Sequence, residues 1–354
     1  MISVTHETLD RPLKIAVDAM GGDLGPEVVV EGVLAAASKS RSEFIMVGDK
    51  ASLEQALKSR GQRPDNVTVR GTTQVILMSD QPAVAFRRKP DASLVVAARM
   101  VKAGEADALI SIGNTGAAMV VSLLTLGRIQ GVDRPAIATP LPTVDGGTVV
   151  LMDAGATVDC DPNNLYEFAL MGSVYSERVM GIKAPRVGLL SNGEEPQKGN
   201  DLVKRTHALL GDTGQDVPPF CFVGNVEGRD VFKGTADVVV CDGFVGNVTL
   251  KTAEGVAEMT MSLIQQELKQ RLWTKLLAAP LRPTLRKLRR RIDYAERGGA
   301  PLLGLNGICI IGHGRSNVRA VANACAAAER AVSQQVVEVI RCRISKAPSP
   351  PPSE

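Results

Sequence analysis

Seven apolar runs mark the chain, and each is followed by a turn and then by apolar residues at helical spacing. The runs are apolar at nearly every position, which is typical of strands that are covered on both faces of a sheet. Strands that alternate with helices are joined by crossovers and therefore lie parallel. The pattern predicts strands at residues 13–18, 43–49, 107–112, 147–153, 185–191, 236–242 and 307–312.

This alternation predicts an α/β fold with a doubly wound, mostly parallel sheet and helices on both faces. We expect residues 11–345 to form a single α/β domain of two lobes, and the proline-rich residues 346–354 to form a disordered tail. No run of about 20 apolar residues occurs, and the N-terminal residues lack the apolar segment of a signal peptide. A cytoplasmic protein is therefore expected.

The basic residues gather in one stretch. The whole chain carries a net charge of +3 and has 3% aromatic residues, so the composition does not favour nucleic-acid binding. Residues 268–292 nevertheless contain nine basic residues and no acidic one. Pro280 and Pro283 divide this stretch into a helical hairpin at about 265–297. Two interpretations stay open: a solvated basic helix pair, or a hairpin tip that dips into an anionic membrane surface. The candidate membrane contacts are Trp273, Leu276, Leu277, Leu281 and Leu285.

Six turns share one pattern, in which a strand ends, a glycine follows with a small polar residue, and a helix begins. They lie at residues 18–23, 111–119, 153–159, 192–200, 241–248 and 312–317. In a parallel sheet such turns emerge at the carboxyl edge, where helix N-terminal amides attract anions and glycine allows a close approach. The pattern favours a phosphate site. The candidate phosphate-binding residues are Gly21, Gly22, Gly113, Asn114, Thr115, Gly116, Gly243 and Gly246.

Several familiar motifs are missing from the chain. It contains no G-x-x-x-x-G-K-[ST], no G-x-G-x-x-G and no G-x-S-x-G. A P-loop nucleotide site, the usual dinucleotide site and a serine nucleophile elbow are therefore disfavoured. The six cysteines lie at least 16 residues apart, so no zinc-binding spacing is present and neither a metal nor a cofactor is expected.

The cations that fall in predicted loops are candidates for binding anions. His313 lies between Gly312 and Gly314, and Lys198 follows a glutamate-rich turn. A turn histidine without a role is the alternative for His313. The basic cluster Arg87, Arg88 and Lys89 fits plain solvation as well as it fits a function.

Longer motifs give a resemblance to a known family. They are IAVDAMGGDLGPE, FRRK, SIGNTGAAM, GRIQGVDRPA, LPTVDGG, DAGATVD, MGSVYSERV, GLLSNGEEPQKGN, GNVEGRD, ADVVVCDGFVGNVTLK and GHGRS, in order between about residues 13 and 343. On these motifs the sequence resembles the phosphate acyltransferases of bacterial phospholipid synthesis, the PlsX family. The resemblance implies transfer of a long-chain acyl group from acyl carrier protein to inorganic phosphate. It also implies a fold like that of phosphotransacetylases and isocitrate-type dehydrogenases.

The resemblance further implies a homodimer at the inner face of the membrane, whose acyl phosphate feeds a membrane glycerol-3-phosphate acyltransferase. Because phosphate is the nucleophile of that reaction, the protein needs to supply no serine, cysteine or metal. Rival interpretations stay open: an enzyme of the same fold that uses acyl-CoA or NAD, and a non-catalytic scaffold that binds phosphate and carrier protein.

Roles for single residues follow from their positions in the glycine turns. Asn114, Thr115 and the amides of Gly113 and Gly116 are expected to cradle phosphate. Lys198 and His313 are expected to neutralise phosphate or the developing oxyanion, and Asn247 to orient the thioester carbonyl. We favour turn capping over general-base catalysis for three strand-end carboxylates. These are Asp18, Asp153 and Asp242, while Arg87, Arg88 and Lys89 are the candidate contacts to the acidic carrier.

Overall fold

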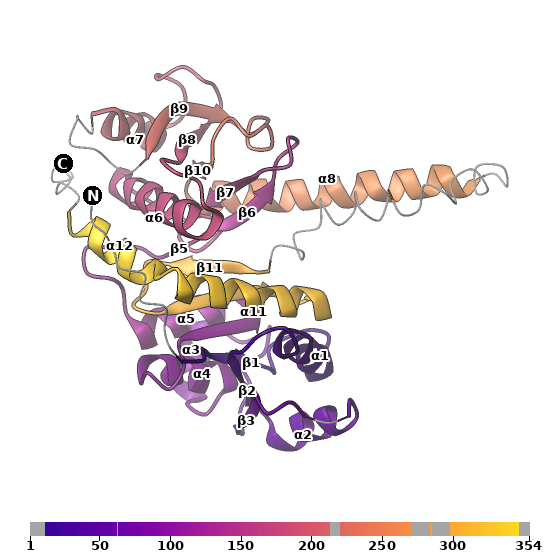
Figure 1. Ribbon diagram of the computed structural model, residues 1–354. Helices are drawn as coiled ribbons and strands as arrows, with labels where there is room; N and C mark the ends of the chain where they lie inside the picture. Colours follow the sequence, from indigo (N-terminus) through magenta and orange to yellow (C-terminus); the bar gives the residue numbers. More distant parts are fainter. Residues whose placement is uncertain (1–10, 62, 213–219, 271–283, 285–297, 347–354) are drawn as a thin grey trace.

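The computed structural model describes residues 11–61, 63–212, 220–270, 284 and 298–346, and these form two β-sheets with helices around them (Figure 1). The first sheet has the strand order β3-β2-β1-β4-β12-β11-β5 within the described residues. Its strands are β1 (Lys14–Asp18), β2 (Glu43–Gly48), β3 (Val67–Gly71), β4 (Ala108–Gly113), β5 (Ala136–Ile137), β11 (Ala300–Leu303) and β12 (Ile308–His313).

Helices cover both faces of the first sheet, as the nearly continuous apolar runs predict. Ile15 and Val17 of β1 join the core that contains α1 (Pro26–Ala37) and α11 (Val318–Ser333). Ala16 joins the separate core of α4 (Ser93–Lys102) and α5 (Thr115–Leu126) on the other face. Successive side chains of a strand point to opposite faces, so both faces of this strand are buried. Two shorter helices, α2 (Lys50–Lys58) and α3 (Pro82–Arg88), complete this half of the chain.

The second sheet has the order β6-β7-β10-β8-β9 within the described residues. Its strands are β6 (Thr139–Pro142), β7 (Thr148–Met152), β8 (Arg186–Ser191), β9 (Cys221–Glu227) and β10 (Val238–Val240). The four strands β7, β10, β8 and β9 are parallel, and β6 pairs with β7 in the antiparallel sense. The helices of this half are α6 (Pro162–Met180), α7 (Asp201–Asp212), α8 (Gly243–Gln270) and α12 (Val336–Ile344).

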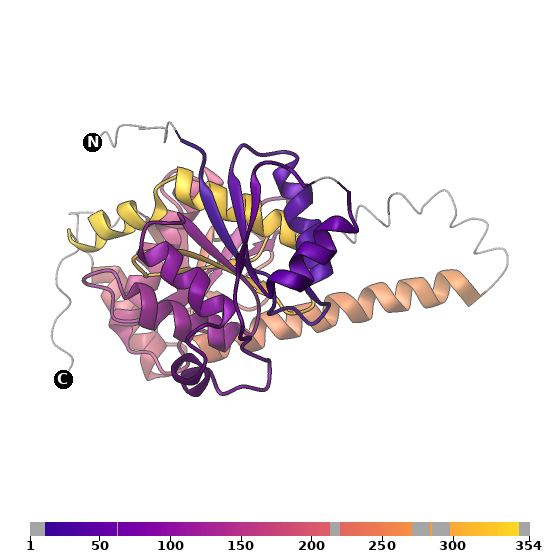
Figure 2. The same ribbon diagram turned by 90° about the horizontal axis from the view of Figure 1, so that it is seen from below.

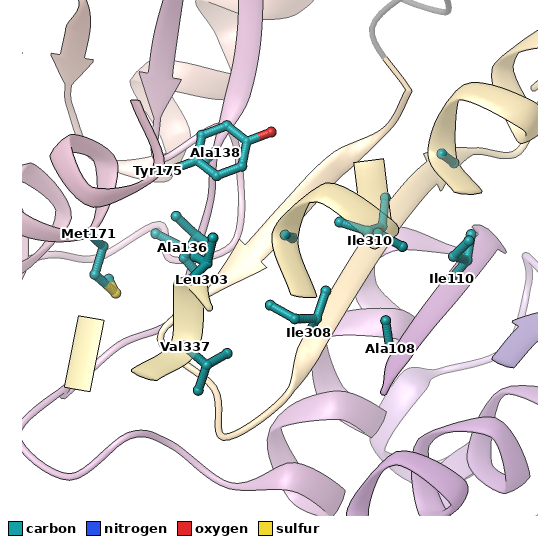
Figure 3. Close-up of a cluster of buried hydrophobic side chains, with 14 of the residues drawn as sticks. Ala108, Ile110, Ala136, Ala138, Met171, Tyr175, Leu303, Ile308, Ile310 and Val337 are labelled. Carbon is teal, nitrogen blue, oxygen red and sulfur yellow. The ribbon is translucent and has the colours of Figure 1, made fainter. Parts of the chain in front are cut away.

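One buried cluster joins the two sheets. It contains residues of β4 and β12 from the first sheet and residues of β7, β8 and β10 from the second. Figure 3 shows side chains of this cluster, among them Met171 of α6, Leu303 of β11, Ile308 of β12 and Val337 of α12. Because the cluster is continuous, the carboxyl edges of the two sheets are held in a fixed relation to each other.

All seven predicted strands are present, with ends that differ by at most about two residues, so the α/β class is confirmed. The strands form two sheets rather than one, and β6, β11 and β5 make antiparallel pairs. Five strands were not predicted: β3, β5, β6, β9 and β11. They are short, lie at edges, or contain glycine or proline, which weakens the strand signal. The single domain of two lobes stays a prediction.

Helix α8 extends away from the rest of the described chain, as Figures 1 and 2 show from two directions. Within the described residues, no helix is both long enough and apolar enough to span a bilayer. The predicted hairpin lies mostly outside these residues. The candidate membrane contacts Trp273, Leu276, Leu277, Leu281 and Leu285 lie outside them as well, as do residues 347–354 of the predicted tail.

Candidate active site

The carboxyl edge of the first sheet contains a topological switch point. β1 lies between β2, which follows it in the chain, and β4, which lies on its other side. Ligands of open α/β sheets bind at such a point, beyond the carboxyl ends of the strands. β12 lies next to β4, with His313 directly opposite Gly113. The turns that follow β1, β4 and β12 therefore emerge side by side.

These three turns pack against one another through their backbones. A Cβ atom on Gly113 would lie 2.3 Å from the carbonyl oxygen of Gly21, so only glycine fits at this position. The N–H of Asp23 donates a hydrogen bond of 2.8 Å to the carbonyl oxygen of Gly314. The structure thus brings Gly21 and Gly22 together with Gly113 and His313, as the sequence predicts for one phosphate site.

Helix α5 begins at this edge. The side-chain oxygen of Asn114 accepts a hydrogen bond of 3.0 Å from the N–H of Ala117, and this caps the helix. Asn114 is therefore occupied as a cap, whereas the N–H groups of Thr115 and Gly116 have no acceptor inside the helix. A helix N-terminus attracts anions through such amides and through its dipole. The backbone of Thr115 and Gly116 is a better candidate for phosphate than the Asn114 side chain.

His313 is held by its own turn. Its Nδ1 accepts a hydrogen bond of 3.3 Å from the N–H of Arg315, which places the proton of the neutral imidazole on Nε2. Burial lowers the pKa of His313 below its usual value, and the charge of Lys251 lowers it further, while Glu254 and Asp23 oppose this effect. A lowered pKa favours a neutral hydrogen-bond donor at neutral pH rather than the cation expected from the sequence.

The carboxyl edge of the second sheet is built around Asp153, which follows β7. Its carboxylate accepts hydrogen bonds from the backbone N–H groups of Ile137, Gly155, Ala156 and Thr157, at 2.6 to 3.1 Å. Burial raises the pKa of Asp153, and these hydrogen bonds oppose that rise. The contacts support the interpretation of Asp153 as a turn cap rather than a general base.

The glycines at the start of α8 pack against the Asp153 turn. The N–H of Gly243 donates to the carbonyl oxygen of Thr157 at 2.8 Å, and that of Gly246 donates to Asp242 at 2.9 Å. A Cβ atom on Gly246 would lie 1.8 Å from the carbonyl oxygen of Asp153. Both N–H groups already have acceptors within the fold, so these contacts do not support the phosphate-binding role predicted for Gly243 and Gly246.

Helix α8 links the two edges. Asn247, Lys251 and Glu254 follow one another at intervals of four and three residues and therefore share one face of the helix. Asn247 lies against Gly155, where a Cβ atom would be 3.3 Å from that of Asn247. Lys251 forms an ion pair of 2.8 Å with Glu254, and both charges act on His313. Neither Lys251 nor Glu254 was predicted from the sequence, although their spacing from Asn247 was a usable signal.

Lys198 lies in the loop that follows β8. Its side chain is exposed, and its backbone N–H donates to the carbonyl oxygen of Glu195 at 3.0 Å. The side chain of Asn192 closes the loop by accepting a hydrogen bond of 2.9 Å from the N–H of Gly199. Among the described contacts, none joins Lys198 to Asn247 or His313, so its catalytic role stays a prediction.

The basic cluster after α3 divides into two parts. Arg87 and Arg88 are exposed, and no carboxylate in the described part of the chain pairs with either guanidinium. Lys89 instead forms an ion pair of 2.5 Å with Asp80 and donates to the carbonyl oxygen of Val75 at 2.9 Å. The ammonium group of Lys89 therefore stabilises the loop, whereas Arg87 and Arg88 remain available for a partner.

Three carboxylates gather beside β9. The ligand atoms of Glu194, Glu227 and Asp230 lie within 4.8 Å of one another. Arg229 lies within 4.0 Å of all three carboxylates, and Lys233 pairs with Asp230 at 2.7 Å. These two cations offset the negative charge of the group, which makes it an ion-pair network rather than a ligand set.

The arrangement of the sheets defines the class of protein: an α/β fold of the phosphotransacetylase type. The EutD phosphotransacetylase from Staphylococcus aureus superposes with a TM-score of 0.60 over 92% of this chain and 94% of its own, at 17% identity. A phosphotransacetylase from Streptococcus pyogenes gives a TM-score of 0.61 over 94% and 96%, at 16% identity. The predicted likeness to phosphotransacetylases is confirmed for the fold.

Sequence comparison then identifies the family. Residues 13–339 match the family described as fatty acid synthesis protein, and the chain belongs to this family. A phosphate acyltransferase from Heliobacterium modesticaldum is 49% identical over 331 residues, which cover 93% of this chain and 97% of the relative. One from a Synechocystis strain is 47% identical over 324 residues, covering 91% and 92%. The resemblance that the motifs indicate is thereby confirmed.

Proposed function

We propose that this chain transfers a long-chain fatty acyl group from acyl carrier protein to inorganic phosphate. Phosphate acyltransferase activity in fatty acid and phospholipid synthesis follows from the family and from the relatives. In the proposed reaction a phosphate oxygen attacks the thioester carbonyl, and the carbon–sulfur bond then breaks. The products are acyl phosphate and the free thiol of the carrier.

One observation carries the proposal: the turns after β1, β4 and β12 meet at the N-terminus of α5, where an anion is favoured. Phosphate bound there is itself the nucleophile. Two thiols are consistent with phosphate, rather than a cysteine, acting as the nucleophile. Burial raises the pKa of the half-buried Cys160 to about 12 and that of the buried Cys309 to about 11. Such thiols are poor nucleophiles at neutral pH.

We assign phosphate to the amides of Thr115 and Gly116, together with Gly21 and Gly22. Among the described residues, the N–H groups of those two β1-turn glycines have no hydrogen-bond acceptor. His313 donates from Nε2 to the phosphate or to the oxyanion that forms on the thioester. A donor aimed at a developing oxyanion lowers the barrier by about 3 kcal/mol.

Two further residues complete the proposed site. Asn247 orients the thioester carbonyl from near the start of α8, and Lys198 offsets the charge of phosphate from the loop after β8. The leaving thiol has an ordinary pKa of about 8.5, so its departure as thiolate needs little help from an acid. Catalysis is then mainly positioning and electrostatic stabilisation.

The test follows thiol release from palmitoyl-carrier protein with and without phosphate, while hydroxylamine traps acyl phosphate. Phosphate-dependent release with hydroxamate formation is expected. His313→Ala and Asn247→Ala should each lower kcat at least about 100-fold. Lys198→Ala should raise the KM for phosphate, whereas Lys204→Ala, an exposed lysine on α7, should not. Release without phosphate dependence would indicate a thioesterase instead, and phosphate binding without any release would indicate a scaffold.

We also propose a homodimer that associates peripherally with an anionic membrane at the inner face of the cell membrane, upstream of a glycerol-3-phosphate acyltransferase. Helix α8 supports the dimer, because its face opposite Asn247 carries an exposed apolar stripe: Val245, Val248, Val256, Met259 and Leu263. A stripe of this kind on a solvent-facing helix is typical of an interface. We expect Val256→Glu with Met259→Glu to give a monomer in sedimentation equilibrium. An unchanged dimer mass would refute this assignment.

Membrane association has a separate test. The basic residues 268–292 support it, since clusters of lysine and arginine attract anionic lipid. The protein should float with vesicles that contain anionic lipid and not with neutral ones. Equal recovery with both kinds of vesicle would contradict an electrostatic attachment.

A further inference from the structure

Helix α3 and the loop before it present an exposed surface of mixed character, which we call the α3 surface. Leu77 is 55% exposed, Met78 is 54% exposed and Val84 is 43% exposed. Arg87 and Arg88 lie three and four residues after Val84, on the same side of the helix. Apolar side chains flanked by unpaired cations are typical of an interaction surface rather than of an ordinary solvated surface.

We propose that the α3 surface is the docking site of the acyl carrier protein, an inference that rests on the proposed function. Carrier proteins are acidic, and the α3 surface offers two guanidinium groups without a carboxylate partner among the described residues. Arg87 and Arg88 steer the acidic partner toward the surface. Leu77, Met78 and Val84 then bury apolar area against it.

The α3 surface is preformed. Lys89 holds the carboxylate of Asp80 at 2.5 Å, and the same carboxylate accepts a hydrogen bond of 2.7 Å from the N–H of Leu77. Lys89 also donates to the carbonyl oxygen of Val75. These bonds fix the loop with Leu77 facing solvent. A surface that is already ordered loses little entropy when a partner binds.

The α3 surface also adjoins the proposed phosphate site. The side-chain amide of Asn114 lies 3.4 Å and 3.3 Å from the carbonyl oxygens of Leu77 and Met78. Pro82, at the start of α3, lies 3.4 Å from the position of a Cβ on Gly116. A carrier docked on α3 therefore delivers its thioester beside the N-terminus of α5. This proximity favours the carrier over a lipid surface as the occupant.

The test compares Arg87→Glu/Arg88→Glu with a control of equal charge change, Lys39→Glu/Lys102→Glu. Lys39 and Lys102 are exposed; Lys39 follows α1 and Lys102 ends α4, at the opposite, amino edge of the first sheet. We expect the α3 variant to lose about tenfold or more in kcat/KM for acyl carrier protein, chiefly through KM. It should also lose most of the salt dependence of kcat/KM, while the control keeps both.

A second variant tests the apolar part. Leu77→Ser/Met78→Ser should raise KM about tenfold and leave the salt dependence in place. The proposal is overturned if the KM values of both α3 variants stay within twofold of the control. It is also overturned if the arginine variant loses only its binding to anionic vesicles, because the surface then serves a membrane.

The docking proposal and the proposed function fail in different ways. Binding of the carrier without its acyl group is measured by fluorescence anisotropy, which needs no turnover. If the wild-type protein binds the carrier and shows no phosphate-dependent release, the reaction is wrong and the docking site stands. If turnover occurs and the arginine variant binds the carrier as the control does, the docking site is wrong and the reaction stands.

Discussion

The carboxyl edges of the two sheets share one short pattern, in which an aspartate at the end of a strand is followed by a glycine turn. The two aspartates, Asp18 and Asp153, differ in the hydrogen bonds that they accept. Asp153 is 0% exposed and accepts hydrogen bonds from four backbone N–H groups. Asp18 is 3% exposed and accepts a hydrogen bond of 3.3 Å from the N–H of Met20 and one from the hydroxyl of Ser93. Burial raises the pKa of Asp18 to about 6.

This difference separates the structural edge, at the second sheet, from the edge of the first sheet, which is the proposed binding edge. At the second sheet the Asp153 turn and the start of α8 use their N–H groups on each other. At the first sheet the N–H groups of Gly21 and Gly22 remain without acceptors among the described residues. Backbone amides bind an anion only if the fold has left them unpaired. The same sequence pattern therefore stabilises one edge and leaves amides available for the proposed phosphate at the other.

The largest loss of stability is expected from a side chain placed in the close contact between α8 and the Asp153 turn. Gly246→Ala places a Cβ 1.8 Å from the carbonyl oxygen of Asp153, so α8 has to move away from β7. We expect a loss of several kcal/mol of unfolding free energy, on the order of the largest single-residue effects, or no soluble protein. Chemical denaturation measures this loss.

The control for this substitution lies on the same helix. A Cβ on Gly255 meets no atom within 4 Å, so Gly255→Ala should be neutral or should stabilise α8 by up to about 1 kcal/mol. Equal stability of the two alanine variants would mean that the Asp153 turn does not contact α8 as described.

Asp153→Asn tests the hydrogen bonds of the structural edge. The new side-chain NH₂ faces N–H donors at Ala156 and Thr157, which leaves buried donors without an acceptor. We expect a loss of about 3 kcal/mol at neutral pH. Urea unfolding measures this loss, and a value below about 1 kcal/mol would show that the carboxylate is replaceable.

Much of the fold follows from local pattern, because every central strand is apolar throughout and ends in a recognisable turn. The division into two sheets does not, since it depends on the edge strands β5, β6 and β11, whose short sequences carry little signal. His313 and Asn247 were selected from the turns that hold them, and their catalytic roles stay predictions. The ion pair of Lys89 with Asp80 could not be predicted, because Asp80 lies in a loop with no periodicity, and the carrier contact of Lys89 stays a prediction. The spacing of Lys251 from Asn247 places both on one face of α8, but the approach of Lys251 to His313 depends on how α8 leaves the second sheet, which the spacing alone does not give.

Asp18→Asn tests the titratable carboxylate of the binding edge. With a native pKa of about 6 and an ordinary unfolded value near 3.9, Asp18 binds more proton in the native state between about pH 4 and pH 6. Stability therefore falls as the pH rises through this window, by up to about 3 kcal/mol, and the loss remains at higher pH. The asparagine side chain removes this contribution.

Unfolding of both proteins is compared at pH 4.5 and pH 8. The free energy of unfolding of Asp18→Asn, minus that of wild type, should be larger at pH 8 than at pH 4.5. Parallel pH curves for the two proteins would mean that Asp18 is ionised in the native state throughout this range, and would remove the contrast with a merely structural carboxylate.

The smallest effect is expected on the pKa of His313, where charges of α8 act on the edge of the first sheet. Lys251 lowers the pKa of His313 and Glu254 raises it, so the two charges of one ion pair act in opposite directions. Lys251→Met should raise the pKa of His313, and Glu254→Gln should lower it further, each by less than about one unit. The chain contains three histidines, so NMR titration can follow the imidazole of His313 directly. The acid limb of kcat/KM at saturating phosphate should move to higher pH in Lys251→Met and to lower pH in Glu254→Gln. Movement in the same direction, or none, would show that α8 does not bring the charge of the second edge to the histidine of the first.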